Sequence, residues 1–178
     1  MRIRSKQKGF SLIELLIVVA IILIIAAIAI PDLLKSRQAA QQASAVGSLR
    51  TVNTSEVTYS STYTLGFSYS LAALDGTANP STAASAGLID SILGGAIKSN
   101  YVFSYSANPA TPAPAIACAN PPTQANVAAT VTVAGYAINA SPLQCAAGNG
   151  NYYFTDQSGV IRMNNTAEAQ PSDSPLAG

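Results

Sequence analysis

A run of apolar residues from Phe10 to Ile30 constrains this chain more than any other feature of its sequence. Four basic residues precede the run, and one acid, Glu14, interrupts it. About 20 apolar residues form a helix that is long enough to cross a bilayer. A carboxylate inside such a helix costs about 2.5–3.5 kcal/mol on insertion scales. Glu14 therefore needs a partner that an isolated helix in lipid cannot provide.

The residues from Lys8 to Leu15 read K-G-F-S-L-I-E-L, which fits the class III prepilin signal pattern K-G-F-[ST]-L-[IV]-E-L. The chain resembles the type IV pilins and the type II secretion pseudopilins over its first third, and it is most like a type IVa major pilin. In that family a membrane aspartyl peptidase cuts after the glycine and N-methylates the phenylalanine. The resemblance implies cleavage between Gly9 and Phe10, with Lys8 in the signal. It also implies that the new amine of Phe10 pairs with Glu14 of a neighbouring subunit and sets the register of assembly.

Two other interpretations of this segment are weighed against the prepilin signal. A secretory signal peptide would also have a basic start, an apolar core and a small-x-small site, here Ala27-Ile28-Ala29. However, the apolar run exceeds the usual 7–15 residues of such a core, and an acid inside it has no use. A permanent membrane anchor is the second alternative, since the basic residues would hold the N-terminus in the cytoplasm while the rest is exported.

Composition limits the function further. Without the first nine residues the chain has five Lys/Arg and eight Asp/Glu, and it has no histidine. A basic nucleic-acid footprint is therefore not evident. The sequence shows no phosphate-binding glycine loop and no paired carboxylates, so we expect no enzyme activity and no cofactor. Asp156 has few acidic neighbours, and we expect no metal site there because calcium takes six to eight oxygen ligands.

The residues predict an α+β fold in which one long helix packs on a small antiparallel sheet of about four strands, and the resemblance implies a pilin-like fold. The helix is expected over 10–59, with a membrane or filament-core segment at 10–30 and a kink near Pro31, since proline removes a backbone hydrogen bond. Its second half should bury a stripe spaced at three and four residues. The expected stripe is Ala39, Ala43, Val46, Leu49, Val52 and Val57.

The rest of the chain divides into an αβ-loop region at 60–99, a sheet at 100–163 and a flexible tail at 164–178. In the loop region we expect a short helix at 87–93 and an aromatic group, Tyr59, Tyr63, Phe67 and Tyr69, that caps a small core. Alternating apolar residues predict four strands. They are expected at 101–105, 127–138, 151–155 and 159–162.

Two cysteines, Cys118 and Cys145, lie in the part expected outside the cytoplasm. The default there is one disulfide, and the resemblance points the same way. Closing this loop would stabilise the fold by roughly 3–4 kcal/mol on the chain-entropy model. Three N-x-[ST] triplets, at Asn53, Asn139 and Asn164, leave surface glycosylation open.

The resemblance implies a structural subunit that polymerises with copies of itself through the helix from Phe10 to Ile30. The precursor would span the inner membrane once, with its C-terminal domain in the periplasm, and would end in an extracellular pilus filament. Its partners would be the prepilin peptidase, the inner membrane, the pilus assembly platform and minor pilins. The alternative is a pseudopilin that forms a short periplasmic filament of a type II secretion system.

Overall fold

The computed structural model describes residues 10–76, 80–108, 132–143 and 150–176. The chain divides into two compact units, residues 1–39 and residues 40–178. The elements follow one another as three helices and then five strands in the described residues. They are α1 (Leu12–Thr62), α2 (Leu71–Leu74), α3 (Ser91–Gly94), β1 (Ile97–Lys98), β2 (Tyr101–Ala107), β3 (Tyr136–Pro142), β4 (Tyr152–Asp156) and β5 (Arg162–Asn164).

The first hydrogen bonds of helix α1 start at Ser11. The Ser11 carbonyl accepts hydrogen bonds from the amides of Glu14 at 3.1 Å and Leu15 at 3.2 Å. The helix continues through Pro31, which lies inside its assigned span. A proline in a helix removes one hydrogen bond, and the kink expected near Pro31 stays a prediction.

In the second unit α1 buries a stripe spaced at three and four residues, as expected for an amphipathic helix. The stripe is Ala45, Ser48, Leu49, Val52, Ser55, Glu56 and Tyr59. The sequence-based stripe had the wrong register at three positions, because Ala39 and Ala43 are exposed and Val57 is 64% exposed. Polar side chains take the core positions instead, since a buried polar group is tolerated when it is hydrogen-bonded.

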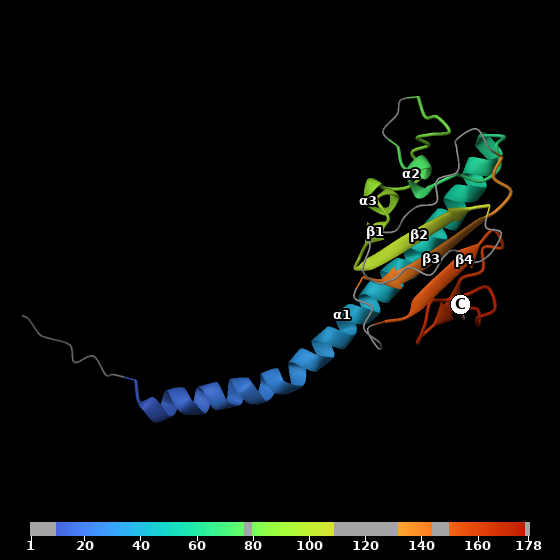
Figure 1. Cartoon of the computed structure of the whole chain (residues 1–178). Helices are drawn as coiled ribbons and strands as arrows, with labels where there is room; N and C mark the ends of the chain where they lie inside the picture. The colour runs from blue at the N-terminus through green and yellow to red at the C-terminus, as the bar shows by residue number, and fades with distance from the viewer. Residues whose placement is uncertain (1–9, 77–79, 109–131, 144–149, 177–178) are drawn as a thin grey trace, which may run out of the picture. The chain divides into compact units, whose positions relative to one another are not determined.

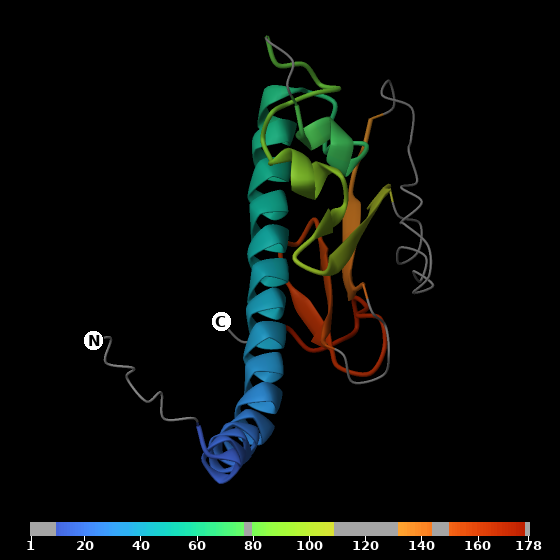
Figure 2. The ribbon, with the colours of Figure 1, turned by 90° about the vertical axis from the view of Figure 1, so that its left-hand side faces the viewer.

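The sheet confirms the α+β architecture. Its five strands pair antiparallel in the order β1-β2-β3-β4-β5, so the chain runs as a meander (Figure 1). The C-terminal part of α1 lies along one face of this sheet (Figure 2). One strand more than expected is present, because β1 has two residues and is too short to carry an alternating pattern.

Alternation along β2 and β3 places one row of side chains toward the core. Phe103 pairs with Ala140 and Tyr105 pairs with Ile138, and all four belong to the cluster that also holds Leu49 and Val52 of α1. Since paired residues of antiparallel strands share a face, this register packs these side chains of the sheet against the helix.

Two strands start more than one residue away from their sequence-based positions. Strand β3 starts after Gly135, whereas the alternating pattern predicted a strand over 127–138, of which 127–131 lie outside the described residues. Val133 instead forms an isolated parallel bridge with Gly66. Likewise β5 starts at Arg162 and not at Gly159, because Gly159 has a positive φ of 72° and belongs to the turn.

The connection after α1 contains two single-turn helices. The Ser70 hydroxyl accepts from the amide of Ala73 and caps α2, and a carboxylate oxygen of Asp90 accepts from the amide of Leu93 and caps α3. Both are standard N-cap residues. The expected helix at 87–93 is therefore shorter and begins later, since Gly87 has a positive φ of 69°.

Gly66 offers a test of how this connection is held. Its φ is +83°, and an added Cβ would lie 2.2 Å from the Val133 carbonyl oxygen. We expect Gly66→Ala to lower the free energy of unfolding by about 3 kcal/mol, through backbone strain and overpacking. Urea unfolding of the detergent-solubilised chain, followed by tyrosine fluorescence, measures the change.

The matched control is Gly159→Ala. Gly159 also has a positive φ, but an added Cβ meets no atom within 4 Å. Only the backbone strain applies there, about 1 kcal/mol. Equal losses at the two positions would contradict the predicted steric conflict between Gly66 and Val133.

The segment after β5, expected as a flexible tail at 164–178, returns along β5 in its described part. Leu176 donates its amide to the Ile161 carbonyl at 2.8 Å, and Arg162 donates to the Asp173 carbonyl at 2.9 Å. Ala169 is buried against Phe154. These contacts cover the edge strand of the sheet, and the flexibility of the tail stays a prediction.

Candidate functional site

The apolar segment at the start of α1 has almost no intramolecular packing. Its side chains are exposed from Phe10 to Ile30, apart from the half-buried Ala26. Phe10 is 73% exposed and Leu12 is 79% exposed, in contrast to the fully buried Leu49 of the second unit. By length and composition, α1 is able to cross a membrane. An apolar surface of this extent marks a membrane or protein interaction site.

Glu14 lies in the first turn of α1. The sequence Ser11-Leu-Ile-Glu14 has the spacing of a capping box, in which the acid at the third helical position reaches back to the cap residue. A carboxylate here also interacts favourably with the positive end of the helix dipole. Glu14 therefore has a local structural role available to it besides the intersubunit pairing predicted from the resemblance, and any test must separate the two.

The structure describes only some of the remaining predicted site residues. Phe10 precedes α1 and Pro31 lies inside it. Lys8 and Gly9 of the expected cleavage signal lie outside the described residues, as do Cys118 and Cys145. Cleavage after Gly9, methylation of Phe10 and the disulfide stay predictions.

Glu56 is a notable residue that the sequence analysis missed. Its carboxylate is fully buried between α1, the following connection and β2. One carboxylate oxygen accepts from the Ser68 amide at 2.8 Å, and the other accepts from the Ser68 hydroxyl at 2.6 Å and the Tyr105 hydroxyl at 2.8 Å. Burial raises the pKa of Glu56, and these hydrogen bonds oppose that rise in part. A helical-wheel position facing the core is the only sequence signal that could have found it.

The aromatic residues near Glu56 complete the core, as expected. Tyr59 is buried, and Tyr63, Phe67 and Tyr69 pack against the same cluster. The rings of Tyr59 and Tyr63 lie 4.8 Å apart. Burial, with smaller contributions from Tyr69 and Glu56, raises the pKa of Tyr59 to about 12. The interpretation of this group as the cap of a small core is confirmed.

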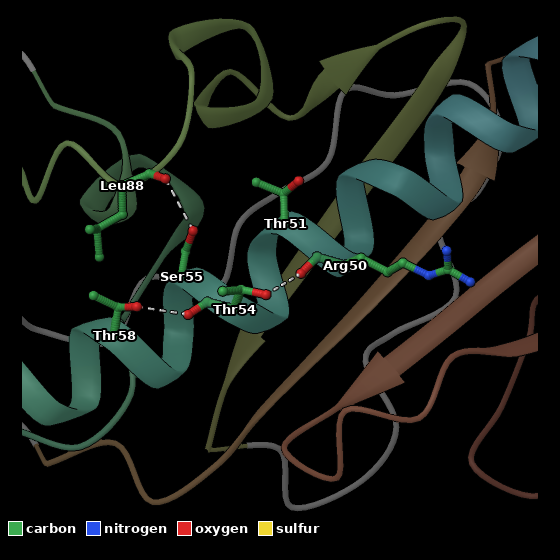
Figure 3. Close-up of a pocket in the computed structure, with 6 residues that line it drawn as sticks. All are labelled: Arg50, Thr51, Thr54, Ser55, Thr58 and Leu88. Atoms are coloured by element: carbon green, nitrogen blue, oxygen red, sulfur yellow. Dashed lines mark hydrogen bonds between the residues drawn. The ribbon is translucent and has the colours of Figure 1, made fainter. Parts of the chain in front are cut away.

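A hollow of about 460 Å³ lies on α1 beside the connection (Figure 3). It is lined by Arg50, Thr51, Thr54, Ser55, Thr58 and Leu88. The hydroxyls of Thr54 and Thr58 donate to carbonyls one turn earlier on α1, and Ser55 donates to the Leu88 carbonyl at 3.1 Å. Arg50 extends away from Thr58 in Figure 3. These hydroxyls are used internally, so the hollow presents little that would select a ligand.

The three triplets that left glycosylation open have engaged or buried asparagines. The Asn53 amide nitrogen donates to Thr155 at 2.9 Å and to the Gly159 carbonyl at 3.2 Å. Asn139 is only 2% exposed. The Asn164 amide nitrogen donates to an Asp173 carboxylate oxygen at 3.2 Å. Each of these nitrogens would have to leave its place in the fold before a glycan could be attached.

Acidic side chains of the second unit serve as turn and cap residues. Asp156 accepts from the Ser158 amide at 2.9 Å within the β4–β5 turn. Asp90 pairs with Lys98 at 2.7 Å, and the Lys98 and Leu93 hydrogen bonds lower the pKa of Asp90. Among the described residues, no cluster of three His, Cys, Asp or Glu side chains could hold a metal ion.

Comparison with known proteins places the start of the chain in context. Residues 4–30 match the family model described as Prokaryotic N-terminal methylation motif. A 58-residue stretch is 43% identical to a protein named Type IV major pilin protein PilA from Myxococcus xanthus (strain DK1622). This alignment covers 33% of the chain and 26% of that relative, so the chain matches about a quarter of the relative's length. No solved structure matches the chain.

The chain therefore combines a match to a methylation motif, at the start of a long apolar helix, with an α+β domain. The motif and the similarity to the Myxococcus major pilin support a type IV pilin. Both matches concern a limited part of the chain, and the relative's role is a property of the relative.

Proposed function

We propose that the chain is a structural subunit of a type IV pilus. It is made as an inner-membrane precursor with its C-terminal domain in the periplasm, cut after Gly9, N-methylated at Phe10 and polymerised into an extracellular filament. The prepilin peptidase, the assembly platform and minor pilins are its partners in this scheme. Its role is structural, without a reaction of its own and without a cofactor.

The observation that carries this proposal is the exposure of the apolar segment from Phe10 to Ile30. A helix that is apolar on all sides is unstable in water and must be surrounded by lipid or protein. The methylation motif overlaps this same segment. In the precursor, membrane lipid would cover the apolar surface of the helix. In a fibre, other copies of the same helix would cover it.

Polymerisation through this helix would generate an open filament. Each copy uses one side of its segment against the next copy, and a head-to-tail contact whose rotation does not close builds a helical fibre. In our proposal the Phe10 amine of one subunit pairs with Glu14 of its neighbour. The pair neutralises both charges inside the packed helices, where an unpaired carboxylate is expensive.

Intact mass and N-terminal sequencing test the proposal. The protein is isolated both from sheared extracellular fibres and from membranes. We expect the sheared fraction to contain a chain that begins at N-methylated Phe10. The same processed chain confined to membranes would overturn the assignment as an abundant fibre subunit, in favour of a pseudopilin or a minor subunit. A chain that begins at Ile30 or retains Met1 would overturn the prepilin interpretation altogether.

A further inference from the structure

Three successive positions on one face of α1 hold the connection that follows the helix. The Ser55 hydroxyl donates to the Leu88 carbonyl at 3.1 Å, and the Tyr59 hydroxyl donates to the Ala83 carbonyl at 2.7 Å. Glu56 binds Ser68 through both carboxylate oxygens. Of these three anchors, Glu56 alone carries a group that ionises between pH 4 and pH 9.

Within the part of the chain that the structure describes, no cationic side chain contributes to the environment of Glu56. The ionisable groups that face it are tyrosines: Tyr59 on α1, Tyr105 on β2 and Tyr136 on β3. Tyr136 stacks on Tyr105, with ring centroids 6.1 Å apart. The ion pair of Lys98 with Asp90 involves neither Glu56 nor these tyrosines. A buried carboxylate without a positive partner is costly, so the geometry favours the neutral acid.

The hydrogen atoms in this cluster can be counted. The Tyr105 hydroxyl lies 2.8 Å from a Glu56 oxygen and 2.7 Å from the Ser68 carbonyl, and it has one hydrogen to donate. The Ser68 hydroxyl likewise lies 2.6 Å from the same Glu56 oxygen and 3.2 Å from the Ser70 carbonyl. The Ser68 hydroxyl also lies 3.0 Å from the Tyr105 hydroxyl. Each hydroxyl has one hydrogen and more than one acceptor, so it donates to Glu56, to a backbone carbonyl of the connection or, in the case of Ser68, to Tyr105.

The protonation state of Glu56 decides that choice. When Glu56 is neutral, its own hydrogen can bond a hydroxyl oxygen of Ser68 or Tyr105. The two hydroxyls are then free to donate to the Ser68 and Ser70 carbonyls. When Glu56 is ionised, it draws both hydroxyl hydrogens, and the two carbonyls lose these donors. Loss of a proton thus removes side-chain support from the backbone at residues 68–70.

We propose that Glu56, Ser68 and Tyr105 form a proton-linked latch that holds residues 66–74 against α1. With the proton bound, the segment is fixed by the carboxyl group and by the two backbone carbonyls. With the proton lost, the buried charge favours opening of the segment, which admits water to Glu56. The anchors at Ala83 and Leu88 keep the later part of the connection in place.

The direction of the pH effect follows from linkage. Because the pKa of Glu56 is raised by burial above its ordinary value of 4.5, the closed latch binds more protons than the open one. Its stability is fully present below pH 4.5 and is lost as the pH rises through the raised pKa. Over that window the opening constant increases by up to about tenfold for each pH unit.

Hydrogen exchange with mass spectrometry on the detergent-solubilised full chain tests the latch, with rates corrected for the intrinsic pH dependence of exchange. Peptides within 66–74 are compared with peptides within 83–95 from pH 4 to pH 9. We expect the corrected opening constant to rise more than twofold in the first group and to change less than twofold in the second. An equal rise in both segments would show global unfolding and overturn the proposal.

Two variants sharpen the test. Glu56→Gln keeps the size of the side chain and a hydrogen-bond donor to the cluster, but it cannot ionise. The rise of the opening constant with pH within residues 66–74 should therefore vanish. Asp90→Asn removes a carboxylate of the exposed pair with Lys98 and should leave the rise unchanged. A rise that persists in Glu56→Gln overturns the proposal. If that variant does not fold, a carboxyl ¹³C titration of Glu56 in the unmodified chain decides, and an ordinary titration midpoint overturns the proposal.

Discussion

Replacement of Glu14 with valine is expected to abolish fibre formation while the chain is still cut after Gly9 and methylated. In the proposed filament, the variant leaves the Phe10 amine of the neighbouring subunit buried without its counter-charge. Removal of one partner of a buried pair costs about 3–5 kcal/mol, which lowers subunit association by about 10²- to 10⁴-fold. Sheared-fibre yield and the intact mass of the membrane fraction measure assembly and processing separately.

Glu14→Gln distinguishes charge pairing from helix capping. Glutamine serves in a capping box as glutamate does. This variant therefore keeps the possible capping interaction with Ser11 at the start of α1, but it loses the negative charge. We expect Glu14→Gln to assemble as poorly as Glu14→Val. Fibres at the normal yield from Glu14→Gln, together with none from Glu14→Val, would show that Glu14 caps the helix and that the pairing is wrong.

Gly9→Val is expected to block cleavage completely and to leave the precursor in the membrane. The resemblance to prepilins places Gly9 at the cut, where a branched side chain would obstruct the peptidase. Retention of residues 1–9 also deprives Phe10 of a free amine, so the partner of Glu14 is never formed. Intact mass should show the full chain without methylation, and no fibres should be recovered.

The matched control for this variant is Gly47→Val in the second unit. An added Cβ at Gly47 meets no atom within 4 Å, and the position is exposed on α1. This chain should be cut and methylated as usual. A processed chain from Gly9→Val would contradict the assigned cleavage site, because the peptidase would then accept another bond.

Local sequence signals predicted the helix and the general nature of the fold. The apolar run from Phe10 to Ile30 is almost continuous in the sequence. Neighbouring residues alone therefore predict that it is helical and has no apolar partner within the chain. The alternating residues of β2 and β4 likewise gave strands within two residues of those observed. Strand β1 was missed, because two residues form a strand only when β2 is beside them.

The buried face of α1 shows where local signals end. Apolar spacing favoured Ala43 and Val57, yet Ser48, Ser55 and Glu56 occupy the core. Hydropathy places such polar residues in solvent, and only specific partners reverse that preference. Those partners, Leu88 for Ser55 and Ser68 with Tyr105 for Glu56, are between 12 and 49 residues away in the sequence.

The sequence by itself determined the helix that cannot remain in water, the acid within its first turn, the match to the methylation motif and the α+β class. These depend on residues that are neighbours along the chain. Only the tertiary structure decided that Glu56 is buried against Ser68 and Tyr105, and that Gly66 must approach Val133. It also decided that Asn139 is enclosed. The reason is physical: burial and hydrogen bonding join groups that are distant in sequence, and their free energies depend on the contacts that folding creates.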